Sequence, residues 1–115
     1  MSYITGFLTP VKTENKDRYV ASAQKGWDLF KEFGATAQVE AWGEDVPDGK
    51  TTSFPMAVKL EDGETVVFSW LLWPDKATAD AAWQKMMDDP RMKDMDMPFD
   101  GKRMMWGGFT PIFES

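Results

Sequence analysis

Apolar and polar residues alternate along several short segments of this chain and recur every three to four residues along two longer ones. Residues 3–9 alternate and end at Pro10, which cannot continue a central hydrogen-bonded ladder, so they are predicted to form a first strand. Helical spacing follows, with Thr13 as a candidate cap and Gly34 as a candidate terminator. The apolar positions that define this predicted helix are Val20, Ala23, Trp27 and Phe30.

The second part of the chain repeats this order. Residues 37–42 alternate and predict a second strand. Residues 56–60 form a short alternating segment before a Glu-Asp-Gly-Glu turn, and residues 65–73 form a strong β-type run after it. These two segments are therefore predicted to pair as a hairpin. Asp75 then stands where it would cap a second helix.

Pro90 ends that second helix, and the residues around Met92 are expected to add a short helical turn. Residues 104–113 are predicted to be a last strand, in which Gly107 and Gly108 mark a bulge or the close approach of another backbone. The order of elements is the βαββαβ pattern of a ferredoxin-like sandwich, an α+β fold with two helices on one face of an antiparallel sheet. The length favours one domain, spanning residues 1–115.

The run of residues 65–73 is apolar on both of its faces. One face carries Val67, Ser69, Leu71 and Trp73, and the other carries Val66, Phe68, Trp70 and Leu72. Helices of the same chain can cover only one face, and a large apolar patch is rare on a soluble monomer. We expect the second face to be covered by a second copy of the chain in a homodimer. The alternative is that residues 56–60 or the methionine-rich loop fold over it.

Composition narrows the possible chemistry. The net charge of −6 and the lack of a long basic run argue against a nucleic-acid partner. Because the chain has neither cysteine nor histidine, it offers no thiolate nucleophile, no thiolate metal site and no histidine to shuttle protons at neutral pH. No cofactor and no metal are expected. The N-terminus does not resemble a signal peptide, and no segment is apolar enough to span a membrane, so a cytoplasmic protein is expected.

Glu40 is the candidate catalytic residue. It shares a strand face with Trp42, and Trp70 is expected to lie nearby across the sheet. A carboxylate held against indole rings would have a raised pKa and could act as a general base. The alternative, which we prefer, is that Glu40 lies at the dimer contact and pairs with a basic residue of the other chain.

Residues 88–109 concentrate charge and methionine. Arg91, Lys102 and Arg103 could converge on the carboxylate of a small ligand, but the neighbouring aspartates favour an ion-pair network instead. Trp106 is a further candidate for lining a ligand pocket. Met92, Met95 and Met97 could be thioether ligands for Cu(I), but without Cys or His they are better explained as adaptable apolar filler.

Six separated segments of the sequence, taken in order, carry a resemblance to a known family. They are FKEFGA, DVPDGK, FPMAVKL, VVFSW, KMMDDPRM and MPFDGKRMMWGGF. Together they resemble the YbaA-like family of uncharacterised bacterial proteins over nearly the full chain. The resemblance implies a member of the dimeric α/β-barrel superfamily, in which two ferredoxin-like protomers join their sheets. It implies a fold but no established activity.

Three functions remain open from the sequence. The first is a homodimer that binds a small, mostly apolar molecule in a pocket between sheet and helices, favoured by the aromatic content and the missing catalytic groups. The second is a cofactor-independent enzyme of monooxygenase, isomerase or lyase type, with Glu40 as base, Trp42 and Trp70 as walls, and Arg91 or Arg103 as anion holder. The third is a structural or accessory dimer that acts through a protein partner.

Overall fold

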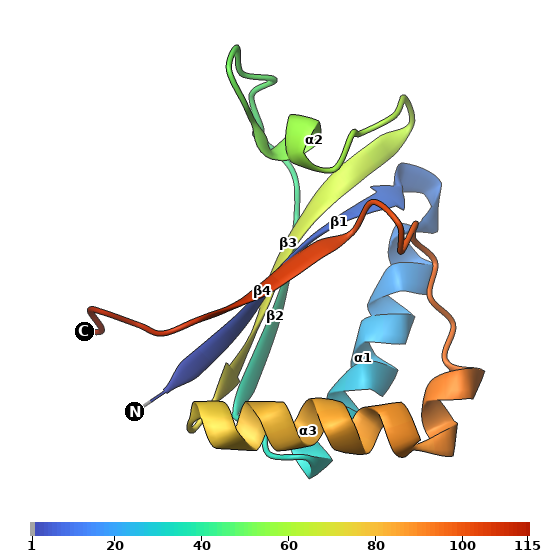
Figure 1. The fold of residues 1–115 in the computed structure, drawn as a ribbon. Helices are drawn as coiled ribbons and strands as arrows, with labels where there is room; N and C mark the ends of the chain where they lie inside the picture. Colours follow the sequence, from blue (N-terminus) through green and yellow to red (C-terminus); the bar gives the residue numbers. More distant parts are fainter. Residues whose placement is uncertain (1) are drawn as a thin grey trace.

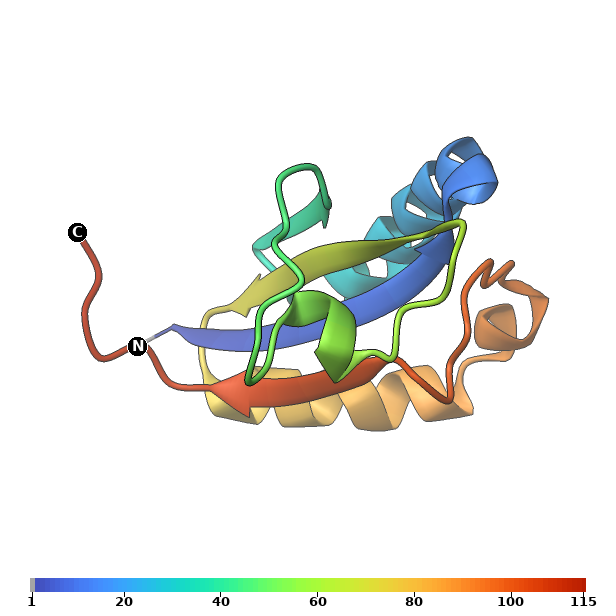
Figure 2. The same ribbon diagram turned by 90° about the horizontal axis from the view of Figure 1, so that it is seen from above.

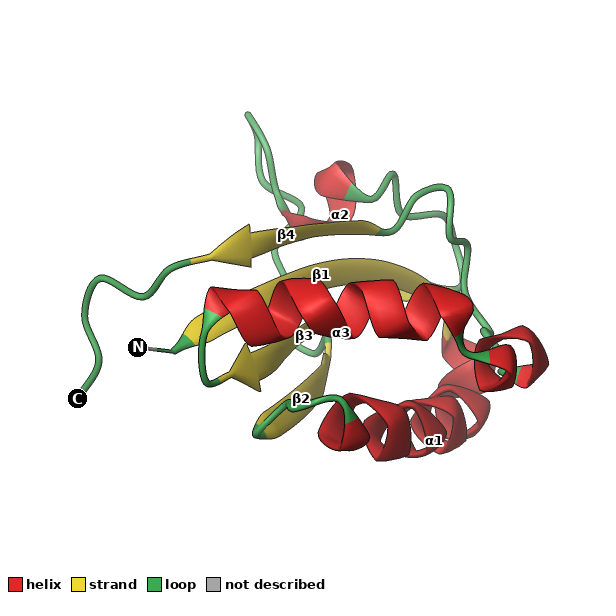
Figure 3. Cartoon of the chain, turned by 60° about the horizontal axis from the view of Figure 1, so that its bottom comes forward, coloured by secondary structure: helices red, strands yellow, loops and turns green. Residues whose placement is uncertain are grey.

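The computed structural model describes residues 2–115. A four-stranded antiparallel sheet is built from β1 (Tyr3–Lys12), β2 (Ala37–Trp42), β3 (Glu64–Trp73) and β4 (Met105–Phe109) in the order β2-β3-β1-β4. Two long helices, α1 (Lys16–Glu32) and α3 (Lys76–Asp88), lie on one face of this sheet (Figure 1). The short helix α2 (Phe54–Ala57) lies on the opposite face (Figure 3). The predicted ferredoxin-like arrangement is confirmed.

Capping interactions define where the helices begin and end. The Asp75 carboxylate accepts from the backbone N–H of Thr78 at 2.7 Å and starts α3, as predicted. Gly34 adopts φ = 112° after α1, where glycine is favoured because it lacks a Cβ atom. A 3-10 turn, η1 (Thr13–Asn15), precedes α1, and the Thr13 hydroxyl bonds that of Thr65 at 2.7 Å instead of capping the helix. The helical turn predicted near Met92 is η2 (Pro90–Asp94).

Two strand predictions need correction. β1 continues through Pro10 to Lys12, because β4 pairs only with residues 4–8 of β1 and leaves the proline beside a single neighbouring strand. Residues 56–60 do not form a strand. The Ser53 hydroxyl accepts from the backbone N–H of Met56 at 3.1 Å, and Pro55 suits the first helical turn, so this segment begins as α2.

The last strand also differs from the prediction, since β4 ends at Phe109 and contains no bulge. Gly107 and Gly108 pair in regular register with Gly6 and Thr5 of β1. A Cβ atom on Gly108 would overlap the Tyr3 hydroxyl, so the close approach at this position comes from a side chain and not from another backbone.

The core between sheet and helices has two clusters. One is centred on Leu71 and Trp73 of β3 with Ala79 and Ala82 of α3, and the buried indole of Trp73 donates to the Thr5 hydroxyl at 3.0 Å. The other is centred on Val11, Tyr19 and Val67, with Trp42 and Phe99 packed around it. The two clusters lie at different ends of the helix-covered face and leave the middle of that face less filled.

The opposite face of the sheet is apolar along every strand, as expected from the apolar residues on both faces of β3. Its side chains, identified from the pairing register, are Ile4, Leu8, Pro10, Ala37, Val39, Ala41, Val66, Phe68, Trp70, Leu72, Met105 and Phe109. We call this set the open face. α2 and the residue after it cover only one end of it: the Phe54 ring contacts that of Phe68 with centroids 6.1 Å apart, and Val58 is buried. Figure 2 shows α2 over that part of the sheet.

Part of the open face remains exposed: Val39, Ala41, Phe68, Met105 and Phe109 are exposed, whereas Pro10 and Val66 are buried. Phe68 is 49% exposed, Met105 47% and Phe109 59%. The alternative in which a segment of the chain covers this face is therefore realised only in part. No helix within residues 2–115 combines the length and the hydrophobicity that crossing a membrane requires.

Candidate functional site

A cavity of about 150 Å³ lies between the middle of the sheet and α1. Its wall on the sheet side is formed by β1, β2 and β3, and its outer wall by η2 and the residues that follow it. The lining side chains are mostly apolar, and the polar ones come from Thr9, Tyr19, Ser22, Gln38, Glu40 and Ser69. Its volume is comparable to that of an apolar cavity that takes up one benzene molecule.

Small residues on the inward face of α1 explain why this space exists. Ser22 and Ala23 lie four and three residues before Gly26, and all three line the cavity. Opposite them, the buried side chains of Thr9 and Ser69 are also small. Larger residues at these positions would fill the interior at the density usual for a protein core.

One end of the cavity is polar because β2 directs two polar side chains toward the helices. Gln38 pairs with Leu71 and Glu40 with Ser69 across the sheet, so all four lie on the helix-covered face. The Tyr19 hydroxyl donates to Glu40 Oε1 at 2.6 Å, and the Gln38 side-chain amide donates to Glu40 Oε2 at 2.9 Å. Glu40 thus accepts one hydrogen bond on each of its oxygens.

The surroundings of Tyr19 keep its hydroxyl protonated. Burial raises the pKa of Tyr19 far above its usual value, and the negative charge of Glu40 together with the hydrogen bond to it acts in the same direction. The hydroxyls of Ser69 and Thr9 oppose this shift only in part. Tyr19 therefore acts as a hydrogen-bond donor to Glu40 across the neutral pH range.

Gln38 contributes an acceptor that no group within residues 2–115 satisfies. Its Oε1 atom is buried and, among the described residues, has no hydrogen-bond partner. Buried polar atoms are usually paired, because leaving one unpaired costs about 1–3 kcal/mol. An orphan acceptor on a residue that lines a cavity indicates a position where a donor from outside the chain would be stabilised.

Four methionines form the outer wall of the cavity: Met92, Met95, Met97 and Met104. The loop that carries them is held to α1 by Asp96. Its carboxylate pairs with Arg18 through two contacts of 2.5 and 2.6 Å, and its backbone carbonyl accepts from the Ser22 hydroxyl. The flexible thioether side chains give this wall an adaptable shape.

A second apolar chamber of about 450 Å³ adjoins the first. Both chambers are lined by Phe7, Met92 and Met104. Rotation of the two methionine side chains would change the shape of the wall that the chambers share. The second chamber is completed by Trp83, Met86, Met87 and Trp106. Trp106 is 64% exposed, and the centroid of its ring lies 6.3 Å from the centroid of the Trp83 ring.

The structure brings Glu40 to the cavity and places only one of the two expected tryptophans, Trp42, on the same face of the sheet. Trp42 shares the strand face with Glu40, as predicted, but it packs against the Val11, Tyr19 and Val67 cluster, and the Lys16 ammonium lies 5.5 Å from its ring centroid. Trp70 pairs with Val39 and so lies on the open face. The expectation that Trp70 lies beside Glu40 is therefore wrong, because the register puts Trp70 on the other side of the sheet.

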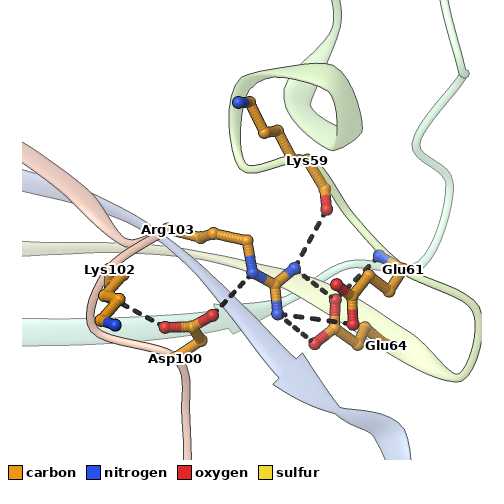
Figure 4. Close-up of polar contacts among 6 residues, drawn as sticks. All are labelled: Lys59, Glu61, Glu64, Asp100, Lys102 and Arg103. Atoms are coloured by element: carbon orange, nitrogen blue, oxygen red, sulfur yellow. Dashed lines mark hydrogen bonds and ion pairs between the residues drawn. The ribbon is translucent and has the colours of Figure 1, made fainter.

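The two candidate anion-holding arginines do not converge. Arg91 lies on the surface, where it pairs with Asp89 at 2.7 Å and with Glu32 at 2.5 Å. The Arg103 guanidinium is held by Glu64 at 2.7 Å and by Asp100 at 2.8 Å, and it also donates to the Lys59 carbonyl at 3.0 Å (Figure 4). The structure contains ion pairs at both arginines, which agrees with the interpretation preferred for this charge cluster.

Tyr19, Gln38 and Ser69 were missed as site residues. A signal for Tyr19 was present, since Tyr19, Ala23, Gly26 and Phe30 form a stripe at helical spacing in which the residues are aromatic or small. The stripe chosen from the sequence contained Val20, which is 44% exposed. Gln38 gave no such signal, because a polar residue on an edge strand usually faces solvent.

No cluster of three or more acidic side chains that could hold a metal ion occurs within residues 2–115. The candidate thioether ligands Met92, Met95 and Met97 all line the cavity, where they contribute apolar surface. Tyr19, Gln38 and Glu40 present hydrogen-bonding groups beside this apolar interior.

The sequence profile of the family described as "Protein of unknown function (DUF1428)" matches residues 2–101. The chain belongs to this family. Relatives described as "Uncharacterized protein YbaA", from Escherichia coli strain K12 and from Shigella flexneri, are each 56% identical over 116 residues. The alignments cover 99% of this chain and 99% of each relative, which confirms the resemblance to the YbaA-like family.

Two solved structures resemble the fold. A dimeric ferredoxin-like protein from an uncultured marine organism has a TM-score of 0.62 at 10% identity, with all of both chains covered. The de novo designed protein Foldit4 has a TM-score of 0.51 at 13% identity, covering 96% of this chain and 99% of the design. At these identities the likeness concerns the fold alone, and it agrees with the ferredoxin-like topology described above.

Proposed function

We propose that this protein is a homodimer that binds a compact, mostly apolar molecule in the cavity between its sheet and its helices. The observation that carries the binding function is the cavity itself, which combines an apolar lining with a single polar end formed by Tyr19, Gln38 and Glu40. Ligand sites typically combine a mainly apolar wall with a few convergent polar groups in this way.

The open face supports the dimer. Aromatic and aliphatic side chains from all four strands lie on it, and α2 covers only one end. A second copy placed sheet against sheet would remove this surface from water and give a closed two-fold assembly. A solved protein of similar fold is described as a dimeric ferredoxin-like protein, which supports a dimer of this chain.

Binding is tested with benzene and toluene, because the cavity volume suits a single ring. We expect both to raise the Tm of the wild type in a concentration-dependent way. Ala23→Leu places a larger side chain in the cavity and should abolish the shift. Ala21→Leu, an exposed position on the same helix, is the matched control and should retain it. A wild type that is not stabilised, or equal shifts in wild type and Ala23→Leu, would contradict the proposal.

A second candidate function is a cofactor-independent enzyme in which Glu40 acts as a base. What favours it is the contact of 2.6 Å between the Tyr19 hydroxyl and Glu40, which orients the carboxylate at the polar end of the cavity. The test is Glu40→Gln, which keeps the shape of the side chain and removes its basicity. An identified turnover that is unchanged in this variant would exclude Glu40 as the base.

A further inference from the structure

We infer that the cavity selects a ring-sized molecule that carries a hydrogen-bond donor, such as a hydroxyl or an amine, and that Gln38 makes this selection. The inference rests on the proposed ligand-binding function and specifies the chemistry of the ligand. It starts from the buried Oε1 atom of Gln38, which has no hydrogen-bond partner among the described residues. Because this atom has almost no accessible surface, a ligand in the cavity reaches it by a rotation of the Gln38 side chain, which lines the cavity.

Glu40 determines which end of the Gln38 amide is left unpaired. The oxygen and nitrogen of a glutamine amide are distinguished only by their hydrogen bonds. Here the atom that faces Glu40 must be the nitrogen, because the Glu40 carboxylate accepts from Gln38 at 2.9 Å and accepts from Tyr19 as well. Turning the amide over would bring two acceptors together. The unpaired group is therefore an acceptor.

The other polar groups at this end also favour a ligand that carries a hydrogen-bond donor. The proton of the Tyr19 hydroxyl is committed to Glu40. Gln38 Oε1 and the remaining lone pairs of the Glu40 carboxylate are all acceptors. A ligand that offers a donor would satisfy Gln38, whereas one that offers only an acceptor would meet an unfavourable oxygen. A ligand without polar groups would leave the oxygen unpaired, as it is in the unliganded protein, and would gain nothing from Gln38.

The size of the cavity limits the rest of the ligand. About 150 Å³ lined by Phe7, Phe30, Leu71 and the methionines accommodates one ring and its substituent. Longer molecules would have to extend past Met92 and Met104 into the second chamber. Three ring-sized probes separate the possibilities: phenol carries a donor, fluorobenzene has nearly the same size without a donor, and pyridine has only an acceptor.

The experiment measures the dissociation constants of these three probes by NMR titration at neutral pH. For the wild type we expect phenol to bind more tightly than pyridine. In Gln38→Met, which removes the acceptor and keeps the side-chain length, the ratio of the fluorobenzene to the phenol dissociation constant should fall about tenfold. Gln84→Met, the same substitution at an exposed position of α3, should leave this ratio unchanged.

Glu40→Gln gives a second and sharper readout. The new amide can donate to Gln38, which allows the Gln38 amide to turn and present its N–H groups to the cavity. The preference should then reverse in favour of pyridine. Equal ratios in the wild type, Gln38→Met and Glu40→Gln would overturn the role of Gln38 while leaving the cavity as a binding site. Failure of the wild type to bind any of the three probes would instead contradict the proposed function.

Discussion

Tyr19 in α1 donates its hydroxyl to Glu40 Oε1 in β2 at a distance of 2.6 Å, and this contact joins the helix to the edge of the sheet beside the cavity. Tyr19 is 8% exposed, whereas Glu40 reaches the surface. The contact therefore joins a buried side chain to one that reaches solvent, at the polar end of the candidate site. Its loss should affect both stability and the orientation of Glu40.

Tyr19→Phe is expected to lower the free energy of unfolding by about 1–2 kcal/mol at neutral pH, because a partly buried hydrogen bond to a carboxylate is lost. Urea unfolding measures the change. Tyr3→Phe is the control, since Tyr3 is the other tyrosine of the chain and none of the described hydrogen bonds involves its hydroxyl. A Tyr19→Phe variant as stable as the wild type would show that the contact contributes nothing to the free energy of unfolding.

The same residue predicts a dependence on alkaline pH. Folding raises the pKa of Tyr19, so the folded protein holds this proton more tightly than the unfolded chain does. The resulting stabilisation is complete below the ordinary tyrosine pKa of about 10 and is lost as the pH rises above it. The stability difference between wild type and Tyr19→Phe should therefore narrow above about pH 10. Tyrosinate absorbance should show Tyr19 ionising only as the protein unfolds.

The Arg103 cluster should matter more for stability than the surface pairs. The side chains of Arg103 and Glu64 are 17% and 7% exposed, so Arg103→Met would leave the Glu64 carboxylate largely buried without its partner. We expect Tm to fall by about 5 °C. Arg18→Met removes a more exposed ion pair to Asp96 and should lower Tm by less than about 2 °C. Similar decreases in the two variants would contradict this ranking.

Glu64 also predicts sensitivity to acid. Its hydrogen bond to Arg103 holds the pKa of Glu64 below the usual glutamate value. The stabilisation is present above the ordinary pKa of about 4.3 and is lost as the pH falls through the lower pKa of the folded state. Glu64→Gln should therefore be less stable than the wild type at neutral pH, and its stability should change less on acidification. Thermal unfolding across this pH range checks the expectation.

Substitution on the open face tests the proposed dimer. Met105 lies on this face at the edge strand β4 and is 47% exposed. Met105→Glu would place a charge in an apolar contact between sheets, so we expect it to shift the protein to monomers at micromolar concentration, measured by sedimentation equilibrium. Met87→Glu, on α3 and 82% exposed, should leave the dimer intact. A wild type that sediments as a folded monomer would remove the basis for the proposal.

A side chain at Gly108 is expected to require movement of the Tyr3 side chain. An added Cβ atom would overlap the Tyr3 ring and hydroxyl, so Gly108→Ala should destabilise the protein by about 1–3 kcal/mol. Tyr3→Leu reduces the crowding, and the double variant should lose less stability than the two single variants added together. Additive losses in this double-mutant cycle would show that Tyr3 is not the obstacle.

Local patterns predicted most of the fold. Period-two alternation identified β2 and β3, and helical spacing with Asp75 and Pro90 identified α3, because each of these signals lies within a few residues. The segment at residues 56–60 was misassigned because a short alternation is weaker evidence than the Ser53 cap and Pro55 that start a helix there. The cap at Ser53 was visible in the sequence and could have corrected the assignment.

The sequence by itself determined the alternation of strands and helices and the apolar character of both faces of β3, since side-chain direction in a strand follows from position alone. Only the tertiary structure decided what surrounds Glu40. The register between β2 and β3 placed Ser69 beside Glu40 and Trp70 on the far face, and the packing of α1 brought Tyr19 to the same point. Register and helix packing depend on contacts between residues distant in sequence, which no local pattern encodes.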